Sequence, residues 1–169
     1  MKIAVIGYSG AGKSTLARKL GERYNIPVLH FDRVYWSSGW QERNQDEYHG
    51  MVHEFMKQPE WVIDGTYTKV EFERRMSEAD TIIFLDLPRL TCFCRAWRRF
   101  FRYRGKVRSD MAEGCPEKMD PEFVWWLLWK GRTLQKKEIF QKILKNYPKK
   151  TVVLKNQREI DRYLEGLPC

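Results

Sequence analysis

The sequence predicts an α/β fold in which a parallel β-sheet carries helices on both of its faces. Short apolar runs that suit buried strands alternate along the chain with longer stretches of helical periodicity, and this alternation is typical of βαβ units. A glycine-rich loop lies between the first apolar run and the first helix, a position where such sheets bind phosphate groups. The chain has 169 residues, enough to bury about 70% of its unfolded surface as one domain. We therefore expect a single domain over residues 1–169.

The glycine-rich loop reads Gly-Tyr-Ser-Gly-Ala-Gly-Lys-Ser over residues 7–14 and fits the phosphate-loop (P-loop) pattern G-x-x-x-x-G-K-[ST] at every fixed position. Its glycines let consecutive N–H groups turn inward toward a phosphate chain, and the following helix adds the positive end of its dipole. The ammonium of Lys13 can reach the β- and γ-phosphates, and the hydroxyl of Ser14 can bind Mg²⁺. The loop therefore predicts a site for ATP and Mg²⁺. The residues of this region that we expect to bind the nucleotide are Gly7, Ser9, Gly10, Ala11, Gly12, Lys13, Ser14 and Thr15.

The remaining elements follow from periodicity and from the residues that start and stop helices. Strands are expected at residues 3–6, 27–31, 61–63, 81–85 and 151–154. Helices are expected from Lys13 and at residues 45–57, 69–76, 90–103 and 159–164, with a further helical stretch from Pro121 to about Tyr147 that Gly131 can break. Residues 105–120 are rich in Gly, Pro and charge and are expected to be irregular.

The formal net charge is +9 and the pI is about 9.4, which favours anionic ligands, either triphosphates or nucleic acid. Eight basic residues and no acid occupy residues 89–108, so much of the surplus lies in one segment. Four of its arginines fall at i, i+3, i+4 and i+7 and share one helix face. We expect this face to clamp a phosphate; the alternative is a solvated basic face. The four are Arg95, Arg98, Arg99 and Arg102, which Arg108 and Arg132 can join.

Three acids end apolar runs and are expected at the carboxyl edge of the sheet, where ligands bind. Asp64 precedes a glycine and suits a residue that holds Mg²⁺ or its water shell; the alternative is a cap for the next turn. Asp32 can accept a proton from an acceptor hydroxyl or hold that acceptor in line with the γ-phosphate; the alternative is an ion pair with Arg33. Asp86 is expected to shape its own turn.

The aromatic residues leave more than one interpretation open. Trp36 and Trp40 lie just beyond Asp32 and can stack on the ring of an acceptor or pack a loop. Phe93, Trp97 and Phe100 occupy a different helix face from the arginines, and this face can pack on the body of the domain. Phe123, Trp126 and Trp129 are expected in the core; a group that contacts a ligand is the alternative.

Histidines and cysteines give no clear metal signal. The histidines, His30, His49 and His53, show no spacing that suggests a metal or catalytic role. The cysteines, Cys92, Cys94, Cys115 and Cys169, show no paired metal spacing, and we expect free thiols; a zinc site built from the first three is the alternative. We see no signal peptide, and the longest apolar stretch, residues 123–129, is too short to cross a bilayer. A cytoplasmic protein without membrane contact is expected.

Several of these motifs together resemble the adenylate-kinase-like branch of P-loop kinases. They are the P-loop, Asp64-Gly65, the acidic turn with proline at residues 81–88, and Arg95-x-x-Arg98-Arg99. Residues 61–67, 85–89 and 108–117 look more narrowly like bacterial DNA topology modulation (FlaR-type) proteins. The resemblance implies a P-loop NTPase fold with sheet order 2-3-1-4-5 and a helical lid at about residues 100–130. It also implies that Arg95 and Arg99 serve the lid. The Phe-Pro-Arg that follows Asp-Gly in adenylate kinases is replaced by Thr66-Tyr67-Thr68, so the arginine that holds an acceptor phosphate is missing; Arg33, Arg43 or Lys69 can substitute.

The sequence thus favours an ATP-dependent kinase that transfers the γ-phosphate to a small acceptor, which is a nucleotide, a nucleoside or another hydroxyl-bearing metabolite. One alternative is a nucleotide-regulated DNA-binding protein that modulates DNA topology, and another is a nucleotide-binding protein without transfer activity. The expected catalytic residues are Lys13, Asp32, Arg95 and Arg99; Arg95, Arg99 and Arg132 also contact the nucleotide; Ser14 and Asp64 hold the metal.

Overall fold

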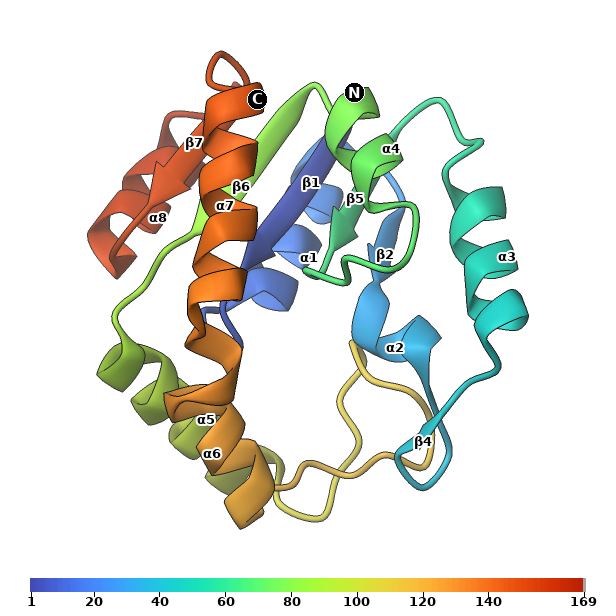
Figure 1. The fold of residues 1–169 in the computed structure, drawn as a ribbon, viewed down its shortest axis with the longest axis vertical. Helices are drawn as coiled ribbons and strands as arrows, with labels where there is room; N and C mark the ends of the chain where they lie inside the picture. The colour runs from blue at the N-terminus through green and yellow to red at the C-terminus, as the bar shows by residue number, and fades with distance from the viewer. Residues whose placement is uncertain (169) are drawn as a thin grey trace.

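A computed structural model describes residues 1–168, so Cys169, expected above to be a free thiol, lies outside the described residues. A five-stranded parallel sheet forms the centre (Figure 1) and consists of β1 (Lys2–Gly7), β2 (Val28–His30), β5 (Trp61–Asp64), β6 (Thr81–Leu85) and β7 (Thr151–Leu154). The strands lie in the order β2-β5-β1-β6-β7. Numbered along the chain within this sheet, that is the order 2-3-1-4-5, so the predicted α/β fold and strand order are confirmed.

The strands are buried on both faces, as their continuous apolar runs require. Five of the six residues of β1 and all four of β5 are buried. In the register of the sheet, Val5 of β1 pairs with Asp64 of β5 on one side and with Ile83 of β6 on the other. The end of β5 therefore lies beside the point where β1 turns into the P-loop.

Helices cover both faces of the sheet. In the view of Figure 1, α4 and α7 lie in front of the sheet and α1 lies behind it. The helices are α1 (Lys13–Tyr24), α2 (Phe31–Tyr35), α3 (Gln45–Phe55), α4 (Phe72–Glu78), α5 (Arg89–Tyr103), α6 (Pro121–Leu128), α7 (Leu134–Asn146) and α8 (Gln157–Glu165), with a 3₁₀ turn at Lys130–Arg132. The break expected at Gly131 is confirmed, and the side chain of Thr133 caps the new helix by accepting a hydrogen bond from the backbone N–H of Lys136.

Two local elements were not predicted. The strand expected at residues 27–31 ends at His30, and Asp32 lies in the first turn of the short helix α2. The chain then forms a two-stranded antiparallel ribbon of β3 (Trp36–Ser37) and β4 (Gln41–Glu42). Arg43 holds this ribbon, because its guanidinium donates to the carbonyls of Val34 (2.8 Å) and Trp36 (3.4 Å). The short strands carry too little periodicity to be read from the sequence.

The segment between α5 and α6 leaves the body of the domain and passes beside β4 before it returns (Figure 1). Met111, Ala112 and Cys115 of this segment are buried in a small second cluster against Trp36 and Trp40. The two tryptophans therefore pack this segment, in ring contact with each other at 5.6 Å, and not on an edge of the main sheet.

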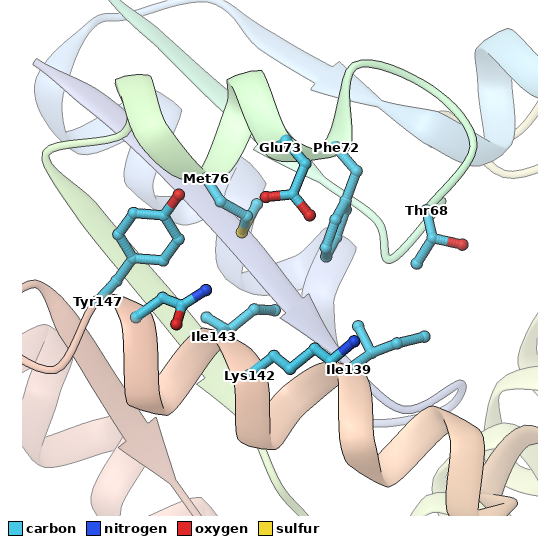
Figure 2. Close-up of a pocket in the computed structure, with 9 residues that line it drawn as sticks. Thr68, Phe72, Glu73, Met76, Ile139, Lys142, Ile143 and Tyr147 are labelled. Carbon is cyan, nitrogen blue, oxygen red and sulfur yellow. The ribbon is translucent and has the colours of Figure 1, made fainter.

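A small hollow of about 180 Å³ lies between α4 and α7. Figure 2 shows Met76 and Phe72 facing Ile143 and Ile139 across it. Most of these side chains belong to the core or pack against it, so the hollow is a packing gap between two helices. Among residues 1–168, no helix has the length and apolar character needed to pass through a lipid bilayer.

Candidate active site

The P-loop forms an open backbone cradle that only glycine can build at its key positions. Gly7, Gly10 and Gly12 have φ values of 144°, 77° and 97°, where side chains are strained. A Cβ at Gly10 would lie 2.5 Å from the carbonyl oxygen of Cys92, and one at Gly12 would lie 3.2 Å from Nη1 of Arg95. The helix α1 begins directly after Gly12 without a side-chain cap. Its first N–H groups are thus free of a competing side chain, and this geometry fits a phosphate chain.

Lys13 is held at this cradle. Its ammonium donates to the carbonyl oxygen of Tyr8 at 3.1 Å, within the same loop. The contact folds the long side chain back over the P-loop, where it can exchange a carbonyl partner for phosphate oxygens. Lys13, Ser14 and Thr15 all line a large cleft of about 1580 Å³, and Asp32, Asp64 and four of the five arginines of α5 line other parts of it.

The residues after β5 are tied to the P-loop through the backbone. The N–H of Gly65 donates to the carbonyl of Val5 at 3.0 Å. The hydroxyl of Thr66 accepts from the N–H of Gly7 and donates to its carbonyl, both at 3.0 Å. Thr66 thereby ties the turn that follows Asp64 to the start of the P-loop. Asp64 and Ser14 line the same cleft.

His30 is a partner of Asp64 that sequence spacing did not reveal. Its Nδ1 lies 2.8 Å from Oδ2 of Asp64, and the two residues face each other in the register of β2 and β5. Burial acts to lower the pKa of His30, but the hydrogen bond and the negative charge of Asp64 outweigh burial and raise the pKa above its ordinary value. The imidazole therefore fixes one oxygen of a carboxylate that is 4% exposed. The pairing of His30 with Asp64 follows from the register of two neighbouring strands, which cannot be found before the order of the strands in the sheet is known.

Arg75 holds the loop that follows β5. Its side chain is fully buried and donates to the carbonyl of Gly65 at 3.0 Å and to the carbonyl of Tyr67. The guanidinium also lies over the ring of Phe31 at 4.3 Å. Burial lowers the pKa of Arg75 to about 9, because a charge is removed from water with carbonyls and a ring in place of a carboxylate. Arg75 thus anchors the turn on which Asp64 depends.

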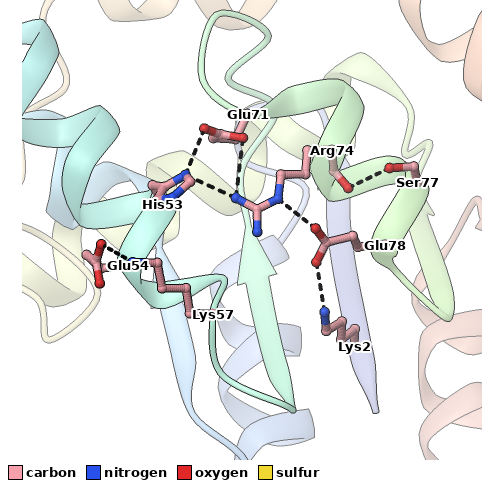
Figure 3. Close-up of polar contacts among 8 residues, drawn as sticks. All are labelled: Lys2, His53, Glu54, Lys57, Glu71, Arg74, Ser77 and Glu78. Atoms are coloured by element: carbon pink, nitrogen blue, oxygen red, sulfur yellow. Dashed lines mark hydrogen bonds and ion pairs between the residues drawn. The ribbon is translucent and has the colours of Figure 1, made fainter.

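The helix that presents Arg75 is tied to its surroundings by a network of charged side chains (Figure 3). Arg74 contacts Glu78 at 2.6 Å and Nδ1 of His53 at 3.1 Å, and Glu78 also binds Lys2 of β1 at 2.7 Å. Figure 3 shows these groups bridging α3, α4 and β1. His53, for which the sequence indicated no role, has a structural one. Exposed pairs of this kind contribute little individually, so the network orients α4 more than it stabilises the fold.

Asp32 is oriented toward the cleft by Tyr67. The phenolic hydroxyl of Tyr67 donates to Oδ1 of Asp32 at 2.7 Å, and the ring stacks on Phe31 at 4.9 Å between centroids. Burial and then the charge of Asp32 raise the pKa of Tyr67 above its ordinary value, so Tyr67 is a neutral donor at neutral pH. The contact replaces the ion pair with Arg33 that was the alternative for Asp32. One oxygen of Asp32 is held, and the carboxylate lines the cleft.

Replacing Tyr67 by phenylalanine is expected to remove the part of stability that depends on this proton. Since the folded pKa is raised, the contribution is present in full below the unfolded pKa of about 10 and is lost at higher pH, with a slope of up to about 1.4 kcal/mol per pH unit. The free energies of unfolding of wild type and Tyr67→Phe, measured in urea across the alkaline range, should therefore converge above about pH 10. A difference that stays constant there would contradict the assignment.

The four arginines that share one face of α5, Arg95, Arg98, Arg99 and Arg102, all line the cleft, as their spacing predicts. Arg95 donates from Nη1 to the carbonyl of Ala11 in the P-loop at 2.6 Å and from Nη2 to Gln157; burial lowers its pKa. Arg99 is not free: its Nε and Nη2 lie 2.8 Å and 2.7 Å from Oε1 of Glu117. Burial, followed by the positive charge of Arg108, lowers the pKa of Arg99. The expected anion among the arginines is thus present in part as a carboxylate of the chain itself.

Arg132 also contacts the P-loop, although it does not belong to the arginine face of α5. Its guanidinium lies 3.8 Å from the centroid of the Tyr8 ring and donates to the carbonyl of Leu87 at 2.8 Å. Trp126 joins it from α6, because its indole N–H donates to the hydroxyl of Ser9 at 3.1 Å. The expectation that Trp126 belongs to the core is wrong: it lines the cleft and is exposed. Trp129 is exposed as well, while Leu127 is the buried residue of α6.

The aromatic face of α5 is likewise not packed on the body of the domain. Trp97 is 44% exposed, and Phe93 and Phe100 are half-buried. Cys92 and Ala96 are the buried residues of this helix. The reason is the close approach noted at Gly10, since α5 crosses the P-loop where only small side chains fit. The expectation that this face packs on the body of the domain is therefore wrong for Trp97, and Phe93 and Phe100 are only half-buried.

Two cysteines of the zinc alternative are engaged elsewhere. Cys92 contacts the carbonyl of Leu87 and a nitrogen of Arg132, and the thiol of Cys115 donates to the carbonyl of Ser37 at 3.1 Å. Cys92, Cys94 and Cys115 are free thiols. Within residues 1–168 no group of three His, Cys, Asp or Glu side chains is placed to hold a metal ion.

The fold of the chain was compared with those of known proteins. No model of a known protein family matches the sequence, and no curated protein matches it. Solved structures do match over nearly the whole chain. A shikimate kinase from Bacteroides thetaiotaomicron is 18% identical with a TM-score of 0.55, covering 98% of this chain and 94% of the kinase. A deoxyadenosine kinase from M. mycoides with dATP bound is 17% identical with a TM-score of 0.52, covering 98% and 97%. The chain therefore has the fold of P-loop kinases.

Proposed function

We propose that the protein is an ATP-dependent phosphotransferase that acts on a small acceptor, with an adenylate-kinase-like arrangement of its lid. The observation that carries the proposal is a single cleft that brings together the P-loop, Asp64, the Tyr67-oriented Asp32 and the arginines of α5. A nucleotide-binding protein without transfer activity has no need of an oriented carboxylate in the cleft that holds the P-loop. The fold likeness to kinases supports the same reading.

Each group has a role that its position supports. The P-loop amides and Lys13 hold the β- and γ-phosphates, and Arg95 and Arg99 bear on the nucleotide from α5. Ser14 and Asp64 would hold Mg²⁺, which when bound neutralises charge on the phosphates. In the transfer the acceptor oxygen forms a bond to the γ-phosphorus while the bond from that phosphorus to the β–γ bridging oxygen breaks. The hydroxyl proton passes to Asp32, and ADP leaves with the bridging oxygen.

The segment of about residues 100–130 is proposed to act as a lid. Trp126 touches the P-loop and residues 111–115 cover Trp36 and Trp40, so this segment spans the cleft from one wall to the other. Residues 101–107 are exposed, which leaves Arg104 and Lys106 open to trypsin.

Addition of ATP and magnesium is expected to slow tryptic cleavage at residues 104–106, because binding makes the segment close on the nucleotide. Cleavage at Lys149, which is exposed on the loop before β7, serves as the internal control and should not change. If the rate of cleavage at residues 104–106 were the same with and without nucleotide, the segment would not be a lid.

The experiment that tests the function is the consumption of ATP against a panel of nucleosides, nucleotides, sugars and small alcohols. At least one acceptor should raise the rate well above hydrolysis by water. With that acceptor, Asp32→Asn is expected to lower kcat by about 100-fold or more, since it removes the proton acceptor and keeps the hydrogen-bond acceptor for Tyr67. ATP binding without transfer to any class of acceptor would favour the inactive nucleotide-binding alternative.

A second candidate function, binding of nucleic acid, is favoured by the outer side of α5. Trp97 and Phe101 are exposed there and in ring contact at 5.4 Å. Arg98 and Arg102, which line the cleft, are also exposed and follow these two rings directly in the chain. Exposed rings with neighbouring cations can stack bases and bind phosphates. DNA binding that falls steeply with salt and is lost in Trp97→Ala would support it. Binding that is weak even at low salt would remove it.

A further inference from the structure

Glu117 is a buried carboxylate placed among the arginines of the cleft. Its side chain is 4% exposed. One oxygen contacts Arg99 at 2.7–2.8 Å, and the other lies 2.7 Å from Nε of Arg108. Arg108 in turn binds Asp110 at 2.6 Å. Arg99, Glu117, Arg108 and Asp110 thus form a chain of ion pairs with two guanidiniums and two carboxylates, which we term the Glu117 network.

The Glu117 network lies on the acceptor side of the cleft. Arg108, Asp110 and Glu117 belong to the segment that packs against Trp36 and Trp40, just beyond Asp32. All four members of the network line the same cleft as Asp32, together with Trp36 and Trp40. The network is therefore part of the wall that an acceptor held near Asp32 would face.

The charges of the Glu117 network itself leave no positive surplus, while other cations of the cleft, Lys69, Arg98, Arg102 and Lys118, are exposed to solvent. Arg99 and Arg108 contribute two positive charges, and Glu117 and Asp110 contribute two negative charges. Asp32 adds one further negative charge. Arg43, one candidate for the missing phosphate-binding arginine, is committed to two backbone carbonyls and to Glu47 at 2.6 Å. A phosphate or carboxylate on the acceptor would meet half-buried arginines that are already paired, next to the buried negative charge of Glu117.

We infer that Glu117 makes the acceptor side of the cleft reject anions, and that the acceptor is an uncharged hydroxyl compound with a ring or other apolar face, such as a sugar or a nucleoside. The inference rests on the proposed function and narrows its acceptor class. The hydroxyl would face Asp32, and the apolar face would lie on the indoles that line this side. A nucleoside monophosphate would need a free cation here, and the structure instead places Glu117 between the cations.

The test uses inorganic phosphate as the probe on full-length protein saturated with magnesium and a non-hydrolysable ATP analogue. Saturation is first shown by a rise in melting temperature. Phosphate is then titrated at constant ionic strength, with tryptophan fluorescence and calorimetry as readouts. The wild type should show no saturable binding up to about 10 mM, whereas Glu117→Gln should bind phosphate at least about tenfold more tightly. The amide keeps the shape of the side chain and removes its charge, which frees one positive charge in the network.

Glu113→Gln is the matched control, since Glu113 is exposed in the same segment and its variant should behave as wild type. Asp110→Asn is a second variant with the same expected direction if Glu117→Gln melts without cooperativity. Saturable phosphate binding by the wild type would overturn the inference, and so would folded variants that gain none. A wild type that is not stabilised by the ATP analogue would instead refute the proposed function, so the two failures are distinguishable.

Discussion

Replacing Lys13 by alanine is expected to lower kcat for phosphoryl transfer by about 100- to 1000-fold or more. The ammonium is the one side-chain cation of the P-loop itself, and its contact with the carbonyl of Tyr8 keeps it over the cradle. Removing a preorganised donor from the charge that develops in a transition state costs about 3–4 kcal/mol. Steady-state kinetics with the acceptor identified in the panel measure the loss.

Lys145→Ala is the control for this experiment. Lys145 is exposed near the end of α7. Its replacement removes the same charge and the same atoms as Lys13→Ala, but from a site that does not line the cleft. Its rate should equal that of the wild type. A Lys13→Ala protein that keeps its cooperative unfolding and its full rate would show that the P-loop does not hold the reacting phosphate.

Replacing Arg75 by alanine is expected to destabilise the protein by about 3 kcal/mol or more, since it removes two charged hydrogen bonds and leaves a cavity under the loop. For a domain of this size that corresponds to a fall in melting temperature of roughly 6–12 °C. The carbonyls of Gly65 and Tyr67 lose their donor, and the turn that carries Asp64 and Tyr67 loosens. Chemical denaturation with urea measures the free energy of unfolding.

Arg74→Ala provides the matched comparison on the same helix. Arg74 is about one-third exposed, and its contacts belong to the charged network of Figure 3. Loss of such exposed pairs is expected to cost about 1 kcal/mol or less. If the two variants were equally stable, the buried guanidinium would not anchor the loop.

The parts of the fold that the sequence predicts are those with local signals. The P-loop is a contiguous pattern, and the strands of the sheet are short apolar runs between turn residues. The order of the strands came from resemblance, because periodicity does not say which strands pair. The positions of Asp32 and Asp64 followed from the rule that ligands bind at the carboxyl ends of parallel strands.

The rest depends on contacts between residues far apart in the chain. His30 meets Asp64 across 34 positions, and Tyr67 meets Asp32 across 35, so no spacing rule finds them. Glu117 lies in a segment without periodicity, and its pairing with Arg99 required the path of that segment. The interpretation of α5 failed for a different reason. A stripe of aromatic residues shows that a helix has two different faces, but it does not show which face packs against the rest of the protein. The close approach of Cys92 to Gly10 shows that the face with small residues does so.

The melting temperature in the presence of ATP and magnesium tests most directly whether the P-loop of this chain binds a nucleoside triphosphate. At a ligand concentration about 100 times Kd, the folded state gains about 2.7 kcal/mol, which corresponds to a rise of roughly 5–10 °C for a domain of this size. We predict that rise for the wild type and its loss in Lys13→Ala. An unchanged melting temperature of the wild type at millimolar ATP and magnesium would contradict a nucleotide site at residues 7–15.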